Sequence, residues 1–251
     1  MTPNLLLLGG TTEATALARA LAEAGIRGTV SFAGRVARPV RQPLPQRVGG
    51  FGGIDGLVRY LQAKQITHLV DATHPFAAQM SANAVAACTT LGVPHLALTR
   101  PAWQRQIGDN WINVPDIAGA AAALNRPRAN VMLAVGRMHL AEFAPNPQHR
   151  YLLRLVDPPD APLPLPETEV IVARGPFSEA DDLALMQTHE IQVVVSKNAG
   201  GIGAYSKIAA SRTLGLPVIM ISRPSLPARQ EVGTVDQVFD WLSHASADRG
   251  V

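Results

Sequence analysis

Residues 5–14 read Leu5-Leu6-Leu7-Leu8-Gly9-Gly10-Thr11-Thr12-Glu13-Ala14. Four consecutive leucines predict a strand that is buried on both faces, as in a parallel sheet. The two glycines allow a tight turn, after which Thr11 or Thr12 can cap a helix that runs on to Leu21. Such a strand, turn and helix direct backbone N–H groups to one point, which suits a phosphate. The run departs from the Gly-x-Gly-x-x-Gly dinucleotide fingerprint, and a buried strand–turn–helix without a ligand fits it as well.

The composition is that of a globular protein. The chain has 251 residues, of which 47% are hydrophobic and 16% charged, so a sizeable core is expected. No apolar run approaches the roughly 20 residues of a membrane span, and no basic segment precedes the leucines as in a signal peptide. The single cysteine, Cys88, excludes a disulfide framework. We therefore expect a cytoplasmic protein, with no membrane partner.

The basic residues are mostly arginine. Only Lys64, Lys197 and Lys207 are lysines among 22 basic residues, and the formal net charge is +3. The planar guanidinium suits carboxylates and phosphates, although a GC-rich genome produces the same bias. The sequence has neither a long basic run nor a zinc-ligand cluster, so neither nucleic acid nor a metal is expected.

Strand and helix patterns alternate along the whole chain, which is typical of an α/β protein. Strands are expected at 29–33, 67–72, 93–98, 111–114, 131–135, 151–156, 170–173, 193–195 and 217–221. Helices are expected around 54–61, 76–91, 116–124, 178–189 and 235–243, and over a segment that carries Lys207 and Arg212.

An internal repeat divides this pattern into two halves. Leu91-Gly92-Val93-Pro94 followed by Arg100-Pro101 recurs as Leu214-Gly215-Leu216-Pro217 followed by Arg223-Pro224, at an offset of 123 residues (214 − 91 and 223 − 100). We therefore predict two Rossmann-like parallel-sheet domains, at residues 1–127 and 128–251, with a cleft between them. Arg126-Pro127-Arg128 is the expected linker.

Two strand ends carry polar residues of interest. The second strand leads into Gly34-Arg35 with no acidic residue nearby, which favours the 2′-phosphate of NADPH over the free ribose of NADH, unless Arg35 is simply solvated. The strand that ends at Asp71 leads into His74, which could bind a phosphate, meet an acidic substrate, carry a proton, or only bond locally at a helix start.

Several motifs together resemble the precorrin-6A reductase family over essentially the whole chain. They are Leu7-Leu8-Gly9-Gly10-Thr11-Thr12-Glu13-Ala14, Ser31-Phe32-Ala33-Gly34-Arg35, Gly49-Gly50-Phe51-Gly52-Gly53, Asp71-Ala72-Thr73-His74-Pro75-Phe76-Ala77, and Ser196-Lys197-Asn198-Ala199-Gly200-Gly201 with Lys207. The resemblance implies that NADPH reduces one ring double bond of precorrin-6A, giving precorrin-6B for cobalamin, by hydride delivery and then protonation. Ala199 departs from the Ser or Thr expected there.

The resemblance also implies roles for individual residues. NADPH is expected on Gly9, Gly10, Thr11, Thr12, Glu13, Ser31, Gly34, Arg35, Gly52 and Thr73. The carboxylate arms of precorrin-6A are expected on His74, Arg100, Arg137, Arg174, Ser196, Lys197, Asn198, Gly200, Gly201, Lys207 and Arg223. The candidate proton donors are His74, Lys197 and Tyr205, with solvent as the alternative.

Two other functions fit part of the pattern. One is an NADPH reductase of a smaller substrate. The other is a two-domain binder of an acidic molecule without chemistry. Both a monomer and an oligomer are compatible with the sequence, and so are precorrin-6A and its cobalt-containing form as the substrate.

Overall fold

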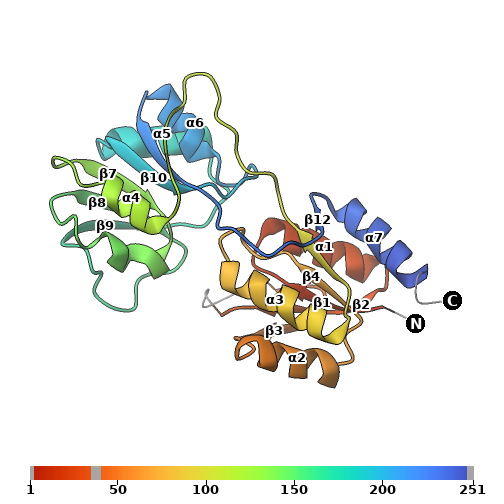
Figure 1. The fold of residues 1–251 in the computed structure, drawn as a ribbon. Coiled ribbons are helices and arrows are strands. Elements are labelled where there is room, and N and C mark those ends of the chain that lie inside the picture. Colours follow the sequence, from red (N-terminus) through yellow and green to blue (C-terminus); the bar gives the residue numbers. More distant parts are fainter. Residues whose placement is uncertain (1–2, 35–40, 248–251) are drawn as a thin grey trace. The chain divides into compact units, whose positions relative to one another are not determined.

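The computed structural model describes residues 3–34 and 41–247 and divides into two compact units. Unit 1 comprises Met1–Pro101 and Ser225–Val251, and unit 2 comprises Ala102–Pro224. Each unit contains a six-stranded sheet flanked by helices (Figure 1). The predicted α/β class with two Rossmann-like sheets is therefore confirmed. Within the described ranges, no helix is long and apolar enough to cross a membrane.

The sheet of unit 1 is entirely parallel, with the order β12-β5-β4-β1-β2-β3. Its strands are β1 (Asn4–Leu8), β2 (Arg27–Phe32), β3 (Gln46–Val48), β4 (His68–Asp71), β5 (His95–Leu98) and β12 (Glu231–Val232). With β12 counted as the sixth strand, this is the 3-2-1-4-5-6 order of dinucleotide-binding sheets. The carboxyl ends of β1, β2 and β4 therefore meet at one edge of the sheet.

The leucine run lies at the centre of this sheet, and helices cover both of its faces. Leu5 and Leu7 pack with α1 (Thr12–Glu23) and α7 (Val235–Ala247), whereas Leu6 and Leu8 pack with α2 (Gly53–Ala63) and α3 (Ala78–Leu91). All four leucines are at most 1% exposed. Alternate side chains point to opposite faces of a strand, so the unbroken apolar run fills both layers of core.

Cys88 of α3 packs among the leucines of the second layer and is 2% exposed. Burial raises the pKa of its thiol to about 12. Since the thiolate is the reactive form, we expect Ellman's reagent to label the native protein at mildly alkaline pH about 10³-fold more slowly than a free cysteine, beyond any effect of access. The rate should recover in concentrated guanidinium. A fast native reaction would show that this layer opens readily.

Unit 2 repeats the architecture, with the parallel order β6-β11-β10-β7-β8-β9. Its strands are β6 (Asn110–Val114), β7 (Asn130–Ala134), β8 (Arg150–Leu155), β9 (Glu167–Val172), β10 (Val193–Lys197) and β11 (Pro217–Ile221). Its helices are α4 (Ile117–Ala123), α5 (Glu179–Thr188) and α6 (Ser206–Thr213), and a 3₁₀ segment, η1 (Arg137–Phe143), follows β7. The order again reads as 3-2-1-4-5-6 when β6 takes the sixth place.

The predicted domain boundary at 127/128 does not coincide with the boundaries of these units. After β5 the chain enters unit 2 and forms β6 beside β11, and after β11 it returns to unit 1 and forms β12 beside β5. The two halves therefore exchange their sixth strands. Arg126-Pro127-Arg128 is not a linker between units, because it lies inside unit 2, where Arg128 forms an ion pair with Glu167 of β9.

Candidate functional site

The glycine turn after β1 is shaped by hydrogen bonds at both of its ends. Gly9 donates its N–H to the Ser31 carbonyl of β2 at 2.9 Å. Gly10 has φ of +129°, and a Cβ placed on it would meet nothing within 4 Å. Only glycine adopts that backbone conformation without strain, and the space beside it is open. The turn can therefore accept a ligand close to its backbone.

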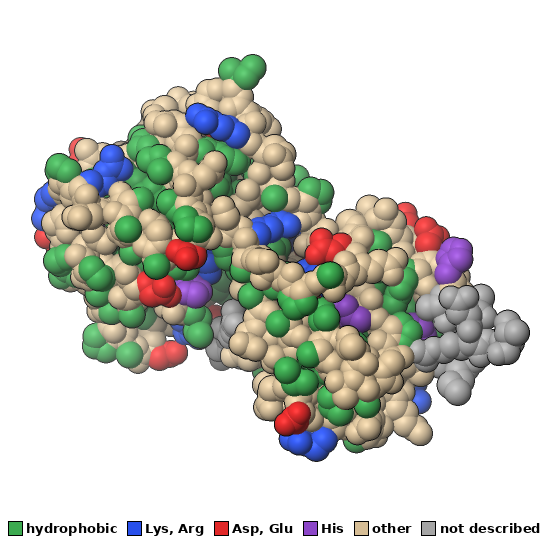
Figure 2. Space-filling view, viewed as in Figure 1, with side chains coloured by type: hydrophobic (Ala, Val, Ile, Leu, Met, Phe, Trp, Pro, Cys, Tyr) green, Lys and Arg blue, Asp and Glu red, His purple; other side chains and the backbone are tan. Residues whose placement is uncertain are grey.

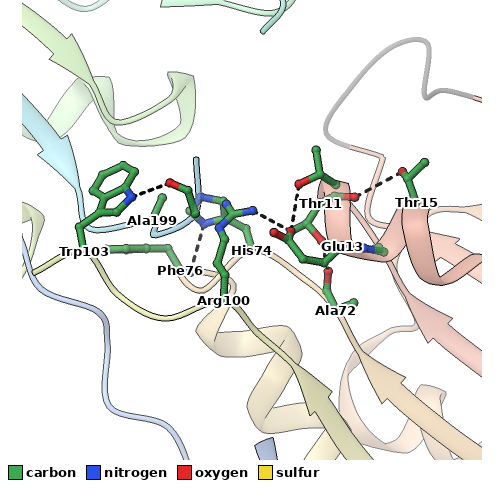
Figure 3. Close-up of polar contacts among 12 residues, drawn as sticks. Thr11, Glu13, Thr15, Ala72, His74, Phe76, Arg100, Trp103 and Ala199 are labelled. Carbon is green, nitrogen blue, oxygen red and sulfur yellow. Dashed lines mark hydrogen bonds and ion pairs between the residues drawn. The ribbon is translucent and has the colours of Figure 1, made fainter. Parts of the chain in front are cut away.

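Thr11 is the N-cap of α1. The sequence predicted that either Thr11 or Thr12 would cap this helix. Its Oγ1 accepts a hydrogen bond from Ala14 N at 3.1 Å and donates one to the Ala72 carbonyl at 2.8 Å (Figure 3). The first contact caps the helix, and the second fastens it to the end of β4. The start of a 12-residue helix is thus held at the carboxyl edge of the sheet.

Glu13 in the first turn of α1 binds Arg100, which follows β5. The Arg100 guanidinium donates to Glu13 Oε2 at 2.7 Å (Figure 3), and Thr12 Oγ1 donates to the same oxygen at 3.1 Å. Glu13 was predicted to contact the nucleotide and Arg100 the substrate. The structure brings the two together, with the side chains 24% and 17% exposed.

The loop after β4 is organised by Asp71, which the sequence analysis did not include in the site. Oδ1 of Asp71 accepts from Thr73 N at 3.1 Å and Thr73 Oγ1 at 2.7 Å. Oδ2 accepts from Ser81 of α3 at 2.6 Å and from Arg229 at 2.9 Å. Thr73 and the adjacent His74 are therefore held from a buried carboxylate. A polar residue at the very end of an apolar strand was the available signal.

His74 is half-buried in this loop, and its ring accepts a local hydrogen bond. Phe76 N donates to Nδ1 at 3.2 Å (Figure 3). A neutral imidazole that accepts at Nδ1 carries its hydrogen on Nε2, which can donate to a ligand. The local bond at the helix start, one of the alternatives that the sequence offered for His74, is therefore present at Nδ1.

The remaining predicted nucleotide residues lie around the ends of β2 and β3. Ser31 is 5% exposed, and its Oγ accepts from Arg47 at 2.7 Å. Gly34 follows β2, and Gly52 is the N-cap of α2. Arg35, the predicted partner of the 2′-phosphate, lies outside the described residues.

In unit 2, a loop after β10 is tied to Trp103. Asn198 Oδ1 accepts from Trp103 N at 2.7 Å, and its Nδ2 donates to the Trp103 carbonyl at 3.0 Å. Trp103 Nε1 donates to the Gly201 carbonyl at 2.6 Å. Arg223 donates to the carbonyls of Asn198 and Ala199, each at 3.1 Å. These contacts fix the predicted Lys197–Gly201 segment, and sequence reasoning missed the part that Trp103 plays.

Two of the predicted substrate residues are buried and used internally. Ser196 is fully buried, with its Oγ donating to the Lys197 carbonyl at 3.2 Å. Lys207 is 8% exposed, and its Nζ donates to the Ala204 carbonyl at 2.5 Å and lies 5.0 Å from the Trp103 ring. Both side chains therefore support the loop from within and are not exposed to a substrate at the surface.

Tyr205, at the start of α6, is half-buried and held by Arg212. Arg212 Nη2 donates to Tyr205 Oη at 2.5 Å, and Arg212 Nε donates to buried Asp109 at 2.8 Å. The hydrogen bond to Asp109 is the main cause that raises the pKa of the Arg212 guanidinium above its ordinary value. A phenol oxygen that accepts from a permanent cation can still donate its own hydrogen.

Arg137 and Arg174 follow β7 and β9 and are surface residues with weak partners. Arg137 lies 3.3 Å from Asp160, whose side chain is 90% exposed, and Arg174 lies 3.9 Å from Asp157. Exposed pairs of this kind contribute about 0–1 kcal/mol. Replacing either of these two ion pairs by an ion pair with a ligand carboxylate would therefore cost little free energy.

Comparison with known proteins gives consistent matches over the whole chain. The model of the family described as "Precorrin-6x reductase CbiJ/CobK" matches residues 4–243. The chain is 55% identical over 249 residues to the precorrin-6A reductase of Rhodobacter capsulatus, which covers 99% of both chains. It is 47% identical to that of a Sinorhizobium species, with 96% and 93% covered. A solved structure titled "CobK precorrin-6A reductase" is 54% identical, covers 97% of both chains and has a TM-score of 0.93.

Proposed function

We propose, from the premise that this chain belongs to the precorrin-6A reductase family, that it reduces a ring double bond of precorrin-6A with NADPH. The family match over residues 4–243 is the observation that carries the proposal. Such a reductase needs a reductant, and the site residues decide which unit would hold it.

Unit 1 is the proposed nucleotide unit. Its glycine turn is followed at once by the 12-residue helix α1, whose first N–H groups and dipole favour a pyrophosphate. In unit 2 the corresponding strand, β7, is followed by the 3₁₀ segment η1. A 3₁₀ segment has poorer hydrogen-bond geometry and a weaker terminus. One dinucleotide per chain, on Gly9–Glu13, follows from this difference.

The carboxyl edge of the sheet in unit 2 offers the chemistry that a flat polycarboxylate ring needs. Arg137, Arg174 and Arg223 follow β7, β9 and β11, and Lys197 is the last residue of β10. These cations can meet carboxylate arms with charge-assisted bonds. Exposed aliphatic side chains lie at the same edge. They are Met138, Val156, Val172 and Ile202, at 68%, 44%, 49% and 94% exposure. Hydrophobic side chains also reach the surface on the face drawn in Figure 2.

NADPH would supply a hydride to one carbon of the ring double bond, and the neighbouring carbon then takes a proton. The protein's part is to position the two molecules and to supply or admit that proton. His74 can donate through Nε2 and Tyr205 through its hydroxyl, and Lys197 and solvent remain the alternatives. The one cysteine, Cys88, is a free thiol. A free thiol fits a reducing compartment, so we propose that the protein acts in the cytoplasm.

The test combines an assay with a binding measurement. Purified full-length protein is incubated anaerobically with precorrin-6A, or its cobalt form, and NADPH, while the absorbance of both is followed. We expect equal consumption of nucleotide and of one macrocycle. NADPH binding without turnover on either macrocycle would favour a reductase of another substrate. Binding of the macrocycle alone would favour a carrier.

A matched pair of variants tests which unit binds the nucleotide. Gly10→Val puts a side chain at φ +129°, into the open space beside the turn, whereas Gly136→Val makes the same change at φ +77° after β7. We expect Gly10→Val to weaken NADPH binding by about 10-fold or more and Gly136→Val to change it by less than about twofold. The opposite ranking would place the nucleotide in unit 2.

A further inference from the structure

A second arginine lies at the carboxyl edge of unit 1, on a strand that the sequence analysis did not predict. Arg47 belongs to β3 and is directly opposite Ser31 of β2 in the parallel register. Ser31 is in turn opposite Leu8, the last residue of β1 before the glycine turn. With about 4.8 Å between neighbouring strands, Arg47 starts about 10 Å to the side of that turn.

The Arg47 guanidinium is held in one orientation by three acceptors. Nη1 donates to Ser31 Oγ at 2.7 Å and to the Gly49 carbonyl at 2.9 Å, and Nη2 donates to the Gly50 carbonyl at 3.0 Å. The central carbon of the guanidinium, Cζ, lies 4.0 Å from the centre of the Phe51 ring and 5.3 Å from the centre of the Tyr60 ring. A guanidinium fixed on an aromatic face keeps little rotamer freedom to lose on binding a ligand.

The remaining donors suit an anion. A guanidinium carries five N–H groups, and the contacts with described residues use three of those on Arg47. By this count Nε–H and one Nη2–H remain, and two oxygens of a phosphate can accept from such a pair. The Ser31 hydroxyl adds a donor of its own, because its oxygen already accepts from Arg47.

We propose that Arg47, fixed by Ser31 and Phe51, recognises the 2′-phosphate of the bound nucleotide and so sets the preference for NADPH over NADH. The inference rests on the proposed function, since it requires the pyrophosphate to bind the glycine turn after β1, two strands away from Arg47. In sheets of this order the adenosine ribose lies at the end of the second strand, and Ser31 is the last residue but one of β2. The place that an acidic residue takes for NADH is therefore occupied by a hydroxyl with a guanidinium behind it.

The experiment compares two small ligands and two cofactors on the full-length chain. Calorimetry measures the binding of 2′,5′-ADP and of 5′-AMP, which differ by the phosphate in question, and steady-state assays give kcat/KM for NADPH and NADH. For Arg47→Gln we expect the preference for the 2′-phosphorylated ligand to fall by about 10- to 100-fold while binding of 5′-AMP changes by less than about twofold. Arg47→Lys should retain part of the preference because it retains the charge.

The control is Arg59→Gln, which removes an exposed arginine of the neighbouring helix α2 and should leave both ligands unaffected. Equal losses for 2′,5′-ADP and 5′-AMP in Arg47→Gln would show that Arg47 only shapes the Gly49–Gly50 turn, and would overturn the inference. An unchanged preference would overturn it as well and would favour Arg35. A wild-type chain that binds neither ligand would instead contradict the proposed function.

Discussion

Replacing Asp71 with alanine is expected to lower the free energy of unfolding by about 3–5 kcal/mol, because it leaves buried Arg229 without its buried counter-ion and with only the half-exposed carboxylate of Glu231 at 2.9 Å. The side chains of Asp71 and Arg229 are 2% and 7% exposed and lie 2.9 Å apart. Thr73 and Ser81 lose their acceptor in the same substitution. Urea unfolding followed by circular dichroism, analysed for both the midpoint and the slope, measures the effect.

Two further variants make this result specific. Asp160→Ala removes the exposed partner of Arg137 and should change the free energy of unfolding by less than about 1 kcal/mol. The double variant Asp71→Ala/Arg229→Ala removes both charges, so its loss should be clearly smaller than the sum of the two single losses. Additive losses would mean that the pair does not interact in the folded protein.

Gly56→Ala is expected to destabilise the protein by about 3 kcal/mol or more, although alanine favours a helix over glycine by about 1 kcal/mol. A Cβ at Gly56 of α2 would stand 1.7 Å from the Phe51 carbonyl oxygen and 2.7 Å from its carbon. These are backbone atoms, so the turn before the helix must move. Thermal and urea unfolding of the variant give the size of the loss.

The matched control for Gly56→Ala is Gly50→Ala in the same glycine-rich segment, where an added Cβ meets nothing within 4 Å. We expect this variant to unfold within about 0.5 kcal/mol of the wild type. Because Phe51 also carries the Arg47 guanidinium at 4.0 Å, Gly56→Ala should reduce the NADPH preference too. Wild-type stability in Gly56→Ala would show that α2 can start elsewhere without loss.

The site was only partly predictable. The capped helix after the glycine turn follows from residues that are neighbours in the chain, and Thr11 performs the expected role. By contrast, Asp71 meets Arg229 across 158 residues, and Trp103 meets Asn198 across 95 residues. No local pattern signals such pairs, because each partner alone resembles an ordinary polar residue at the end of a strand.

The sequence by itself determined the elements and their repetition. The four leucines of Leu5–Leu8 can all be buried only in a strand that has helices on both faces of its sheet. The 123-residue repeat required two similar sheets. Only the tertiary structure decided which sheet receives each sixth strand. Because β12 has two residues and β6 has five, their sequence patterns are too short to predict the strand that each pairs with. Every edge strand offers the same backbone donors and acceptors, so the choice depends on packing against distant residues.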